Sequence, residues 1–433
     1  MSCDWSTVTL AQITSRIGDG LHGTPKYDDS GDYYFINGNN LSNGKVVINE
    51  KTKRTDESQY LKHRKDLNSR TLLVSINGTL GNIGTFQGER VFLGKSVCYL
   101  NILPNVNKDY VMYVLMSKHF QDYIHNLATG STIKNVGLKL IREYEFQLPD
   151  ITTQNKIANV LVSIDSKISL NTQTNQTLEA MAQAIFKSWF VDFDPVKAKM
   201  QGKQPEGMNT DTAALFPDKL VESELGLIPE GWIVKPFKKV IDKYVDNRGK
   251  TPPVVEDGIP LVEVKHLPEN SAFPNLNTDK RVTEETFDTW FRVHVEPKDI
   301  LISTVGTIGR TSFVKNTNFG IAQNVLGLRF GKVVEPEYMF YTVKAHRFQH
   351  DMDARLVTTV QSSIKRKDLD TIDILVPPSN VQKEFCKLVG SLLDGQYRKN
   401  AENIELASLR DALLPKLLSG ELLLTNYREV ANV

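Results

Sequence analysis

Three residues in the middle of the chain have the types and spacing of a metal-dependent nuclease site. Asp257 and Glu263 could hold a divalent cation, and Lys265 could lie near the attacked phosphate. Such catalysis needs both the paired acids and the lysine. The matching stretch of an earlier part of the chain, Phe35-Ile-Asn-Gly-Asn39, carries neither an acid nor a lysine. A nuclease therefore stays only as an alternative to the function argued below.

Two further patterns could hold a ligand. The glycines of Gly78-Thr-Leu-Gly81-Asn-Ile-Gly84 follow an expected strand, as in a phosphate-cradling loop. A phosphate loop must open a helix, whereas the residues that follow here favour another strand, which predicts a tight turn. His346 and His350 have the spacing of a helical metal pair, but no third ligand is evident, which favours a solvated helix face. We expect a non-catalytic chain that binds no metal or cofactor of its own.

Clusters of basic residues, with hydrogen-bonding residues among or near them, indicate contact with nucleic acid. Lysine and arginine neutralise phosphates, while asparagine, glutamine and arginine can read base edges. The candidate DNA-binding residues are Lys26, Asn37, Asn39, Arg54, Lys62, Arg64, Lys65, Ser131, Lys134, Arg248, Lys250, Lys265, His266, Gln361, Ser362, Lys365, Arg366 and Lys367. The net charge of +1 excludes a globally basic coat protein but allows such local patches. Ordinary solvated loops would have the same composition.

An internal repeat organises these residues. Ser75-Ile-Asn-Gly-Thr79 returns as Ser303-Thr-Val-Gly-Thr307, at the offset of 228 residues that separates Gly78 from Gly306. The same offset pairs Gln121 with Gln349. A constant register over most of the chain predicts two copies of one unit, and its period is too long for a solenoid.

Each copy has a strand-rich part and a helical part. Short apolar strands with glycine, asparagine and proline turns predict strand-rich domains over residues 1–150 and 231–377. One amphipathic helix interrupts each domain, near residues 110–128 and 338–354. Long helices are expected within 151–195 and 378–433, the second with a C-terminal tail. Residues 196–230, rich in proline, glycine and acid, are predicted to form a solvated linker.

Both long helices carry a heptad seam, apolar at its ends and polar in the middle. The expected seam residues are Ile157, Ile164, Asn171, Asn175, Leu178, Ile185, Leu392, Asn403, Leu406 and Leu413. Asn175 and Asn403 occupy the same repeat position, where a buried polar residue fixes register at a cost in stability. The seam predicts a coiled coil, although two helices that each pack a separate core would also fit it.

Composition indicates the compartment. No apolar run approaches the length of a membrane helix, and residues 1–20 lack the features of a secretory signal. The three cysteines, Cys3, Cys98 and Cys386, lie too far apart for a disulfide scaffold or a zinc knuckle. We expect a cytoplasmic protein without a membrane partner.

The repeat with its motifs resembles the specificity subunit of type I restriction–modification systems over nearly the whole chain. The resemblance is carried by the paired stretches 73–79 and 302–307 and by the junctions 148–157 and 376–385. The tail Leu413-Leu-Pro-Lys-Leu-Leu-Ser-Gly-Glu-Leu422 contributes as well. It implies an α+β fold: two mixed, strand-rich target recognition domains separated by two long antiparallel helices that form a coiled coil, with internal pseudo-twofold symmetry.

The resemblance also implies a division of labour. Each recognition domain would read one half of a split target in double-stranded DNA, and the helices would set the gap and dock two methyltransferase subunits. Those subunits would bind S-adenosylmethionine and methylate adenine, while restriction subunits would bring ATP and magnesium to the complex. A two-domain scaffold that does not bind DNA is the other alternative, besides the nuclease.

Overall fold

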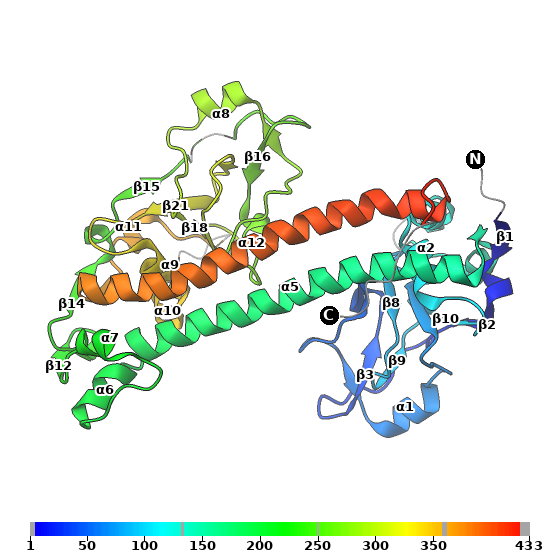
Figure 1. Cartoon of the computed structure of the whole chain (residues 1–433), viewed down its shortest axis with the longest axis horizontal. Helices are drawn as coiled ribbons and strands as arrows, with labels where there is room; N and C mark the ends of the chain where they lie inside the picture. Colours follow the sequence, from blue (N-terminus) through cyan, green and yellow to red (C-terminus); the bar gives the residue numbers. More distant parts are fainter. Residues whose placement is uncertain (1–4, 131–133, 248, 250, 357–361, 425–433) are drawn as a thin grey trace. The chain divides into compact units, whose positions relative to one another are not determined.

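The computed structural model describes residues 5–130, 134–247, 249, 251–356 and 362–424 (Figure 1). The chain divides into two compact units. Unit 1 comprises the residues up to Ile168 and from Ile404 on, and unit 2 comprises Ser169–Asn403. Two 40-residue helices, α5 (Ile151–Phe190) and α12 (Ser379–Leu418), run through both units. Within the described residues, no helix is both long and apolar enough to cross a membrane.

The strand-rich domain of unit 1 is built around a six-stranded sheet in the order β2-β10-β7-β8-β5-β4. It also holds the three-stranded sheet β6-β3-β9 and the antiparallel pair β1–β11. Its strands are β1 (Ser6–Thr9), β2 (Thr14–Asp19), β3 (Tyr33–Ile36), β4 (Leu41–Ser42), β5 (Gly44–Val46), β6 (Arg54–Thr55), β7 (Thr71–Ser75), β8 (Ile83–Thr85), β9 (Val91–Leu93), β10 (Val97–Ile102) and β11 (Glu145–Leu148). Every residue of β7 and β10 is buried, which explains their nearly continuous apolar sequences.

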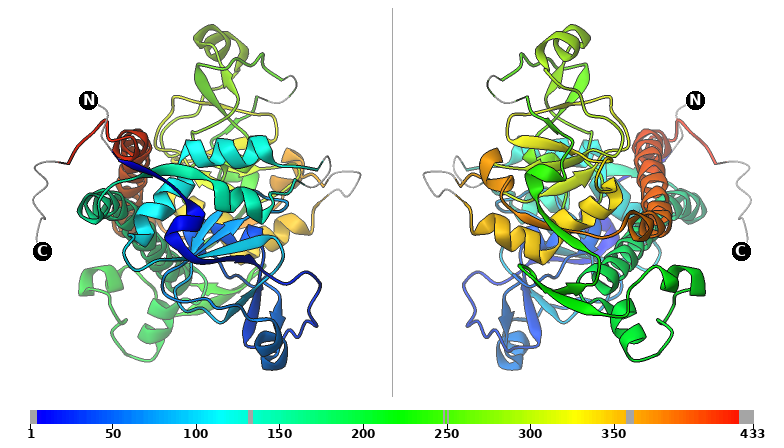
Figure 2. Two further views of the ribbon diagram at one scale, coloured as in Figure 1. Left: turned by 90° about the vertical axis from the view of Figure 1, so that its right-hand side faces the viewer. Right: turned by 90° about the vertical axis from the view of Figure 1, so that its left-hand side faces the viewer.

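Helices pack against this sheet (Figure 2). They are α1 (Glu57–His63), α2 (Lys108–Met116), α3 (Lys118–Leu127) and α4 (Leu138–Glu143). The single helix expected near residues 110–128 is wrong, because the chain breaks at Ser117. Ser117 has extended backbone angles, and its side chain accepts a hydrogen bond from the backbone of Phe120 at the start of α3.

Unit 2 repeats this topology in its own sheets. They have the orders β15-β21-β18-β19 and β17-β16-β20, with the antiparallel pair β14–β22. The strands are β14 (Ile233–Pro236), β15 (Lys243–Val245), β16 (Ile259–Val262), β17 (Arg281–Val282), β18 (Ile300–Ser303), β19 (Thr311–Phe313), β20 (Gly320–Ile321), β21 (Val325–Arg329) and β22 (Asp373–Val376). The helices are α8 (Glu284–Trp290), α9 (Pro336–Lys344), α10 (His346–Asp353) and α11 (Arg366–Leu369). The second expected helix, near 338–354, is thus also two helices.

The same glutamine joins each domain to the helix that follows it. Gln154 Oε1 accepts from the backbone N–H of Asn107 at 2.8 Å, and its Nε2 donates to the Pro149 carbonyl at 2.7 Å. At an offset of 228 residues, Gln382 makes the same two bonds, to Glu335 and Pro377, at 2.8 and 2.7 Å. Both glutamines are buried, so these bonds fix where each long helix begins.

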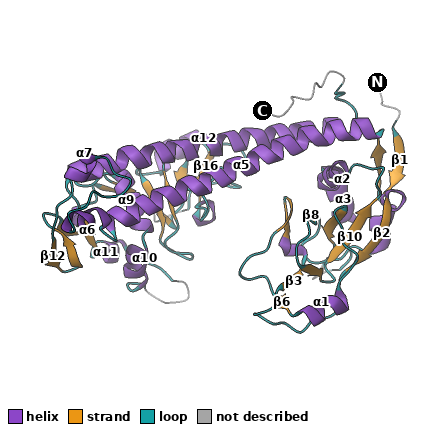
Figure 3. Cartoon of the chain, turned by 60° about the horizontal axis from the view of Figure 1, so that its bottom comes forward, coloured by secondary structure: helices purple, strands orange, loops and turns teal. Residues whose placement is uncertain are grey.

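The long helices pair antiparallel within each unit (Figure 3). In unit 1, Arg410 of α12 donates to Asp165 of α5 at 2.9 Å. In unit 2, Asn171 donates to Asn403 at 3.0 Å, and Asn175 donates to Asn400 at 2.7 Å. Later residues of α5 thus face earlier residues of α12, which confirms the antiparallel coiled coil.

The polar middle of the seam is hydrogen-bonded across the two helices. Asn171 is fully buried and also donates to the Glu402 carboxylate at 2.9 Å. Of the ten expected seam residues, none is exposed: Ile157, Ile164, Asn171 and Asn175 are buried, and Leu178, Ile185, Leu392, Asn403, Leu406 and Leu413 are half-buried. The neighbour Leu393, which the heptad pattern passes over, is completely buried.

Residues 196–230 are folded onto unit 2, so the prediction that this segment is solvated is wrong. They form most of α6 (Asp194–Met200), then α7 (Thr210–Ala214) and the hairpin β12 (Leu220–Ser223)–β13 (Gly226–Pro229). Val196, Phe216 and Ile228 are at most 5% exposed and join the core that contains the last turns of α5. A few apolar residues thus hold a segment whose composition is mainly polar.

Candidate nucleic-acid interface

A glycine turn joins matching strands in both units. Gly78 and Gly81, between β7 and β8, have φ angles of +75° and +81°, and Gly306 and Gly309, between β18 and β19, have +80° and +84°. This left-handed conformation favours glycine. A strand follows in each case, which confirms the tight turn and excludes a phosphate loop of the strand–turn–helix kind.

The turn is fixed by the same hydrogen bonds in the two units. The backbone N–H of Gly78 donates to the Lys134 carbonyl at 3.0 Å, and that of Gly306 donates to the Ser362 carbonyl at 3.2 Å. Lys134 and Ser362 are both candidate DNA-binding residues, and they occupy one repeat position. The fold therefore presents a lysine in unit 1 and a serine in unit 2 beside the same turn.

A glutamine braces each turn from behind. Gln121 Nε2 donates to the carbonyls of Gly81 and Leu115, both at 2.9 Å. Gln349 Nε2 donates to Gly309 at 3.3 Å and to Val343 at 2.7 Å. A Cβ on Gly81 or Gly309 would lie 2.1 Å from the glutamine oxygen, so this close approach also requires glycine. The sequence analysis paired these glutamines but assigned them no role.

Beside this turn, unit 1 has two neighbouring polar cavities that share His22 and Lys95. One, of about 360 Å³, is also lined by Asn77 and Asn135, whose side chains are hydrogen-bonded at 3.2 Å. The other, of about 480 Å³, is lined by Asn37. Asn37 Oδ1 accepts from Ser96 Oγ at 3.0 Å, which fixes the plane of the amide. His22, Lys95, Asn77 and Asn135 were missed from sequence, because only folding brings these separate loops together.

Other candidates of unit 1 lie on and around α1. Lys62 and Arg64 are exposed and Lys65 is half-buried at the end of this helix, and Asn39 is exposed on a separate 3₁₀ turn. The guanidinium of Arg54 lies 5.0 Å from the ring centre of Tyr34. The backbone N–H of the exposed Lys26 donates to Gln59 of α1, which ties its loop to this helix.

In unit 2 the candidates fall into two groups. Ser362, Lys365, Arg366 and Lys367 lie at and before α11, and Arg366 lies 4.5 Å from the ring centre of Tyr244. Lys265 is bonded to Asp279, which raises the pKa of the lysine. His266 is only 5% exposed, and its Nδ1 accepts from the backbone of Glu263, so its ring serves local structure. Burial lowers its pKa. Ser131, Arg248, Lys250 and Gln361 lie outside the described residues.

The acids and lysine of the nuclease alternative do not form a cation site. Glu263 is paired with Lys280 at 2.7 Å, and Lys265 is paired with Asp279 at 2.8 Å, so both are neutralised by local partners. His346 and His350 lie face to face with ring centres 6.2 Å apart. Neither set belongs to the one group of potential metal ligands found among the described residues.

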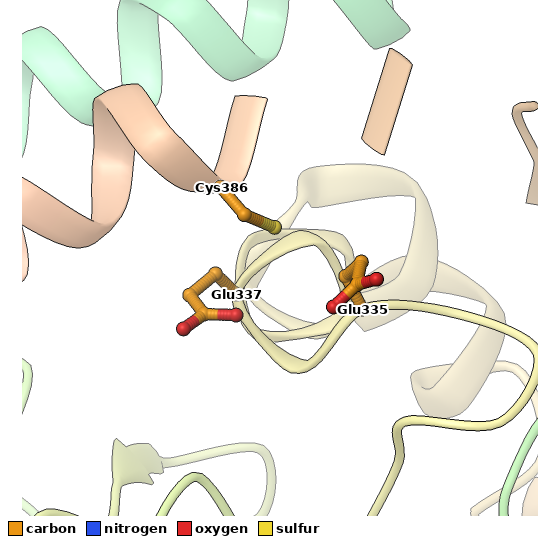
Figure 4. A group of neighbouring side chains, drawn as sticks. All are labelled: Glu335, Glu337 and Cys386. Carbon is orange, nitrogen blue, oxygen red and sulfur yellow. The ribbon is translucent and has the colours of Figure 1, made fainter. Parts of the chain in front are cut away.

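That group consists of Glu335 and Glu337 at the start of α9 and Cys386 of α12 (Figure 4). Their ligand atoms lie within 4.8 Å of one another. Lys298 already neutralises Glu337, with its Nζ 2.8 Å from Oε1, and burial raises the pKa of the Cys386 thiol. Metal binding needs a thiolate and free carboxylates, so this arrangement favours a structural ion pair.

The two units thus share one scaffold and carry different polar side chains on it. A family model for the type I restriction modification DNA specificity domain matches residues 3–180 and 258–405. The chain belongs to this family. As a specificity subunit, it is the non-catalytic component that recognises DNA in a type I restriction–modification system.

Known specificity subunits resemble the chain over most of its length. The type I restriction enzyme HindI specificity subunit of Haemophilus influenzae is 28% identical over 380 residues, which cover 76% of this chain and 81% of that protein. The MjaIX specificity subunit of Methanocaldococcus jannaschii is 23% identical over 427 residues, which cover 97% and 94%. The crystal structure of the M. genitalium S subunit shares the fold, with a TM-score of 0.57 at 18% identity and 96% of each chain covered.

Proposed function

We propose that the two strand-rich domains of this specificity subunit each read one half of a bipartite DNA target. The observation that carries this proposal is a conserved frame with variable contents. Lys95 and Gln323 occupy one repeat position, as do Asn77 and Val305, while the hydrogen bonds that hold the turn between them are the same in both units. One scaffold that displays different side chains is suited to reading two different base sequences.

In unit 1, the polar cavities beside the glycine turn are the proposed base-reading surface. Asn37, Asn77 and Asn135 offer amides, which recognise adenine in bidentate fashion, and Lys95 can donate to guanine. Lys26, Arg54, Lys62, Arg64 and Lys65 would neutralise backbone phosphates around them. In unit 2, Ser362 would lie at the reading surface, and Lys365, Arg366 and Lys367 would contact phosphates.

The remaining steps belong to partner subunits. Methyltransferase subunits would dock on α5, α12 and the recognition domains, bind S-adenosylmethionine and methylate adenine, and restriction subunits would use ATP and magnesium. The chain would work in the cytoplasm, where the cell's DNA is. The support for this assembly is membership of the family, together with the proposed role of the strand-rich domains.

The decisive experiment maps methylated adenines in DNA from cells that express the chain with its methyltransferase subunits. We expect one motif of two short parts separated by a fixed gap. Replacing residues 1–150 by the matching domain of a relative should change one part and leave the other intact. A change in both parts, or methylation without a two-part motif, would contradict the proposal.

The same mapping tests whether the helices set the gap. A heptad inserted in α5 near Asn171 keeps the seam in phase and lengthens this helix by about 10 Å. The gap should grow by at most ~3 base pairs, since DNA rises 3.4 Å per base pair and the unmodified α12 resists the extension. An insertion of two residues is the control, because it breaks the seam and should lower stability instead. A folded heptad variant with the original gap would show that the helices are not the ruler.

A further inference from the structure

An apolar groove of about 850 Å³ lies in unit 1 between the recognition domain and the end of α12. Its walls include Tyr110 and Val114 of α2, Phe146 of β11, and Leu414 and Leu418 of α12. Leu414 and Leu418 are only half-buried, although they are apolar residues next to the core of the unit. A cavity of this size with an apolar lining is a natural place for a bound segment.

Unit 2 contains the same groove. Tyr338, Thr342 and Ile374 replace Tyr110, Val114 and Phe146 at the offset of 228 residues, and Phe186 and Phe190 of α5 replace Leu414 and Leu418 at the reverse offset. The repeat thus builds the groove twice from matched positions. In unit 2, however, its volume is only about 230 Å³.

The difference is made by residues that follow α5. Phe193 and the hairpin residues Leu225, Leu227 and Ile228 line what remains of the groove in unit 2. Ile228 is 5% exposed, and the ring of Phe193 packs edge-on against Trp232 at 5.7 Å. The chain itself therefore shows what this groove accommodates, which is a short antiparallel hairpin with apolar side chains directed into it.

In unit 1 the corresponding cover is incomplete among the described residues. Leu424, which matches Val196 of α6, packs partly against the core of unit 1. No described residue takes the place of the β12–β13 hairpin in the groove. Lys118 and His119 on one side of it and Glu145 and Asp411 on others are exposed, so the rim carries both signs of charge.

We propose that the groove of unit 1 receives a short apolar segment of a methyltransferase subunit, in the way that the β12–β13 hairpin fills the groove of unit 2. This inference rests on the proposed function, which supplies that partner. A second copy of this chain is a poorer occupant, because its own hairpin already buries Ile228 in unit 2 and would have to be released. The groove therefore makes unit 1 dependent on a partner where unit 2 is complete.

The first test places a charge in the groove of the full chain, expressed with its methyltransferase subunits. Met116→Glu and Leu414→Glu should each weaken methyltransferase binding at least tenfold. Leu61→Glu, at a position 52% exposed on α1 and outside the groove, is the matched control and should leave binding unchanged. Circular dichroism of each chain separates lost binding from lost folding. Folded groove variants that assemble and methylate normally would overturn the inference while leaving the proposed function intact.

The second test does not depend on a core substitution. A photo-crosslinking residue in place of Gln147, exposed on the rim of the groove, should attach to the methyltransferase subunit in the assembled complex. The same residue in place of Val47, 40% exposed and outside the groove, should not. Crosslinks only between copies of this chain, or none in a complex that methylates its motif, would overturn the inference. Absence of any methylated motif with the unmodified chain would instead contradict the proposed function.

Discussion

Units 1 and 2 close the same groove with different chemistry. In unit 2, aromatic rings from α5, α9, α12 and the inter-repeat segment interlock, with Phe190 4.8 Å from Tyr338 and 5.0 Å from Phe385. In unit 1, the matching positions of α12 carry leucines, and the groove stays open among the described residues. Two copies of one fold can therefore diverge in how much of their apolar surface each covers by itself.

A second contrast concerns how each domain is tied to the coiled coil. Tyr113 of unit 1 donates to Asp165 at 2.6 Å, and the equivalent Tyr341 of unit 2 donates to Glu179 at 3.1 Å. Both acids lie on α5, although the tyrosines belong to different repeats. Arg410 of α12 neutralises Asp165, whereas Lys344 of α9 neutralises Glu179. The repeat fixes the tyrosine, and the asymmetric sequences of the two helices fix its partner.

The largest expected effect comes from truncating the aromatic cluster. Phe190→Ala should lower the free energy of unfolding of unit 2 by about 3–5 kcal/mol, since it leaves a cavity among buried rings. The matched Leu418→Ala in unit 1 should cost about 1–2 kcal/mol, because this leucine is already half-exposed to the groove. Guanidinium unfolding of the full chain measures both. Equal losses would remove the contrast between the two units.

A smaller effect should be the same in both units. Gln121→Ala and Gln349→Ala should each cost about 1–3 kcal/mol, because each leaves two turn and helix carbonyls without their donor. Thermal unfolding measures the loss, and Gln87→Ala, at an exposed position, is the control. A large loss for one glutamine and none for the other would show that the two turns are not built alike.

The smallest expected effect is a dependence on acid that belongs to unit 2. Burial raises the pKa of Glu179, but the adjacent Lys344 outweighs it and holds the pKa below its usual value of 4.5. A lowered folded pKa adds stability above the ordinary value and loses it as the pH falls through the folded value. Unit 2 should therefore lose about 1 kcal/mol below pH 4.5 through this group.

Urea unfolding as a function of pH tests this dependence. Glu179→Gln should flatten the acid limb for unit 2, because the amide cannot titrate. Glu222→Gln, at an exposed position of the same unit, serves as the control and should leave the limb unchanged. An identical acid limb in the Glu179 variant would show that the ion pair with Lys344 does not contribute.

Local signals in the sequence were sufficient for the frame of this protein. The offset of 228 residues identified two copies, glycines at 78, 81, 306 and 309 predicted the turns, and the heptads predicted the coiled coil. Each of these features depends on a residue and its near neighbours, or on a regular period, so one chain read in order contains it. The resemblance to specificity subunits then supplied the antiparallel pairing.

Other features depended on residues that are distant in sequence. Ser117 interrupted an expected helix because it could cap the next one, and Ile228 was buried because α5 and α9 offered it an apolar groove. The polar cavities of unit 1 join His22, Asn77 and Lys95 from three separate loops. Burial and hydrogen bonding are properties of the assembled core, and the sequence alone gives composition but not neighbours. Tertiary structure therefore decided which of two equivalent grooves is filled by the chain itself, because only the packed residues 191–230 reach the one in unit 2.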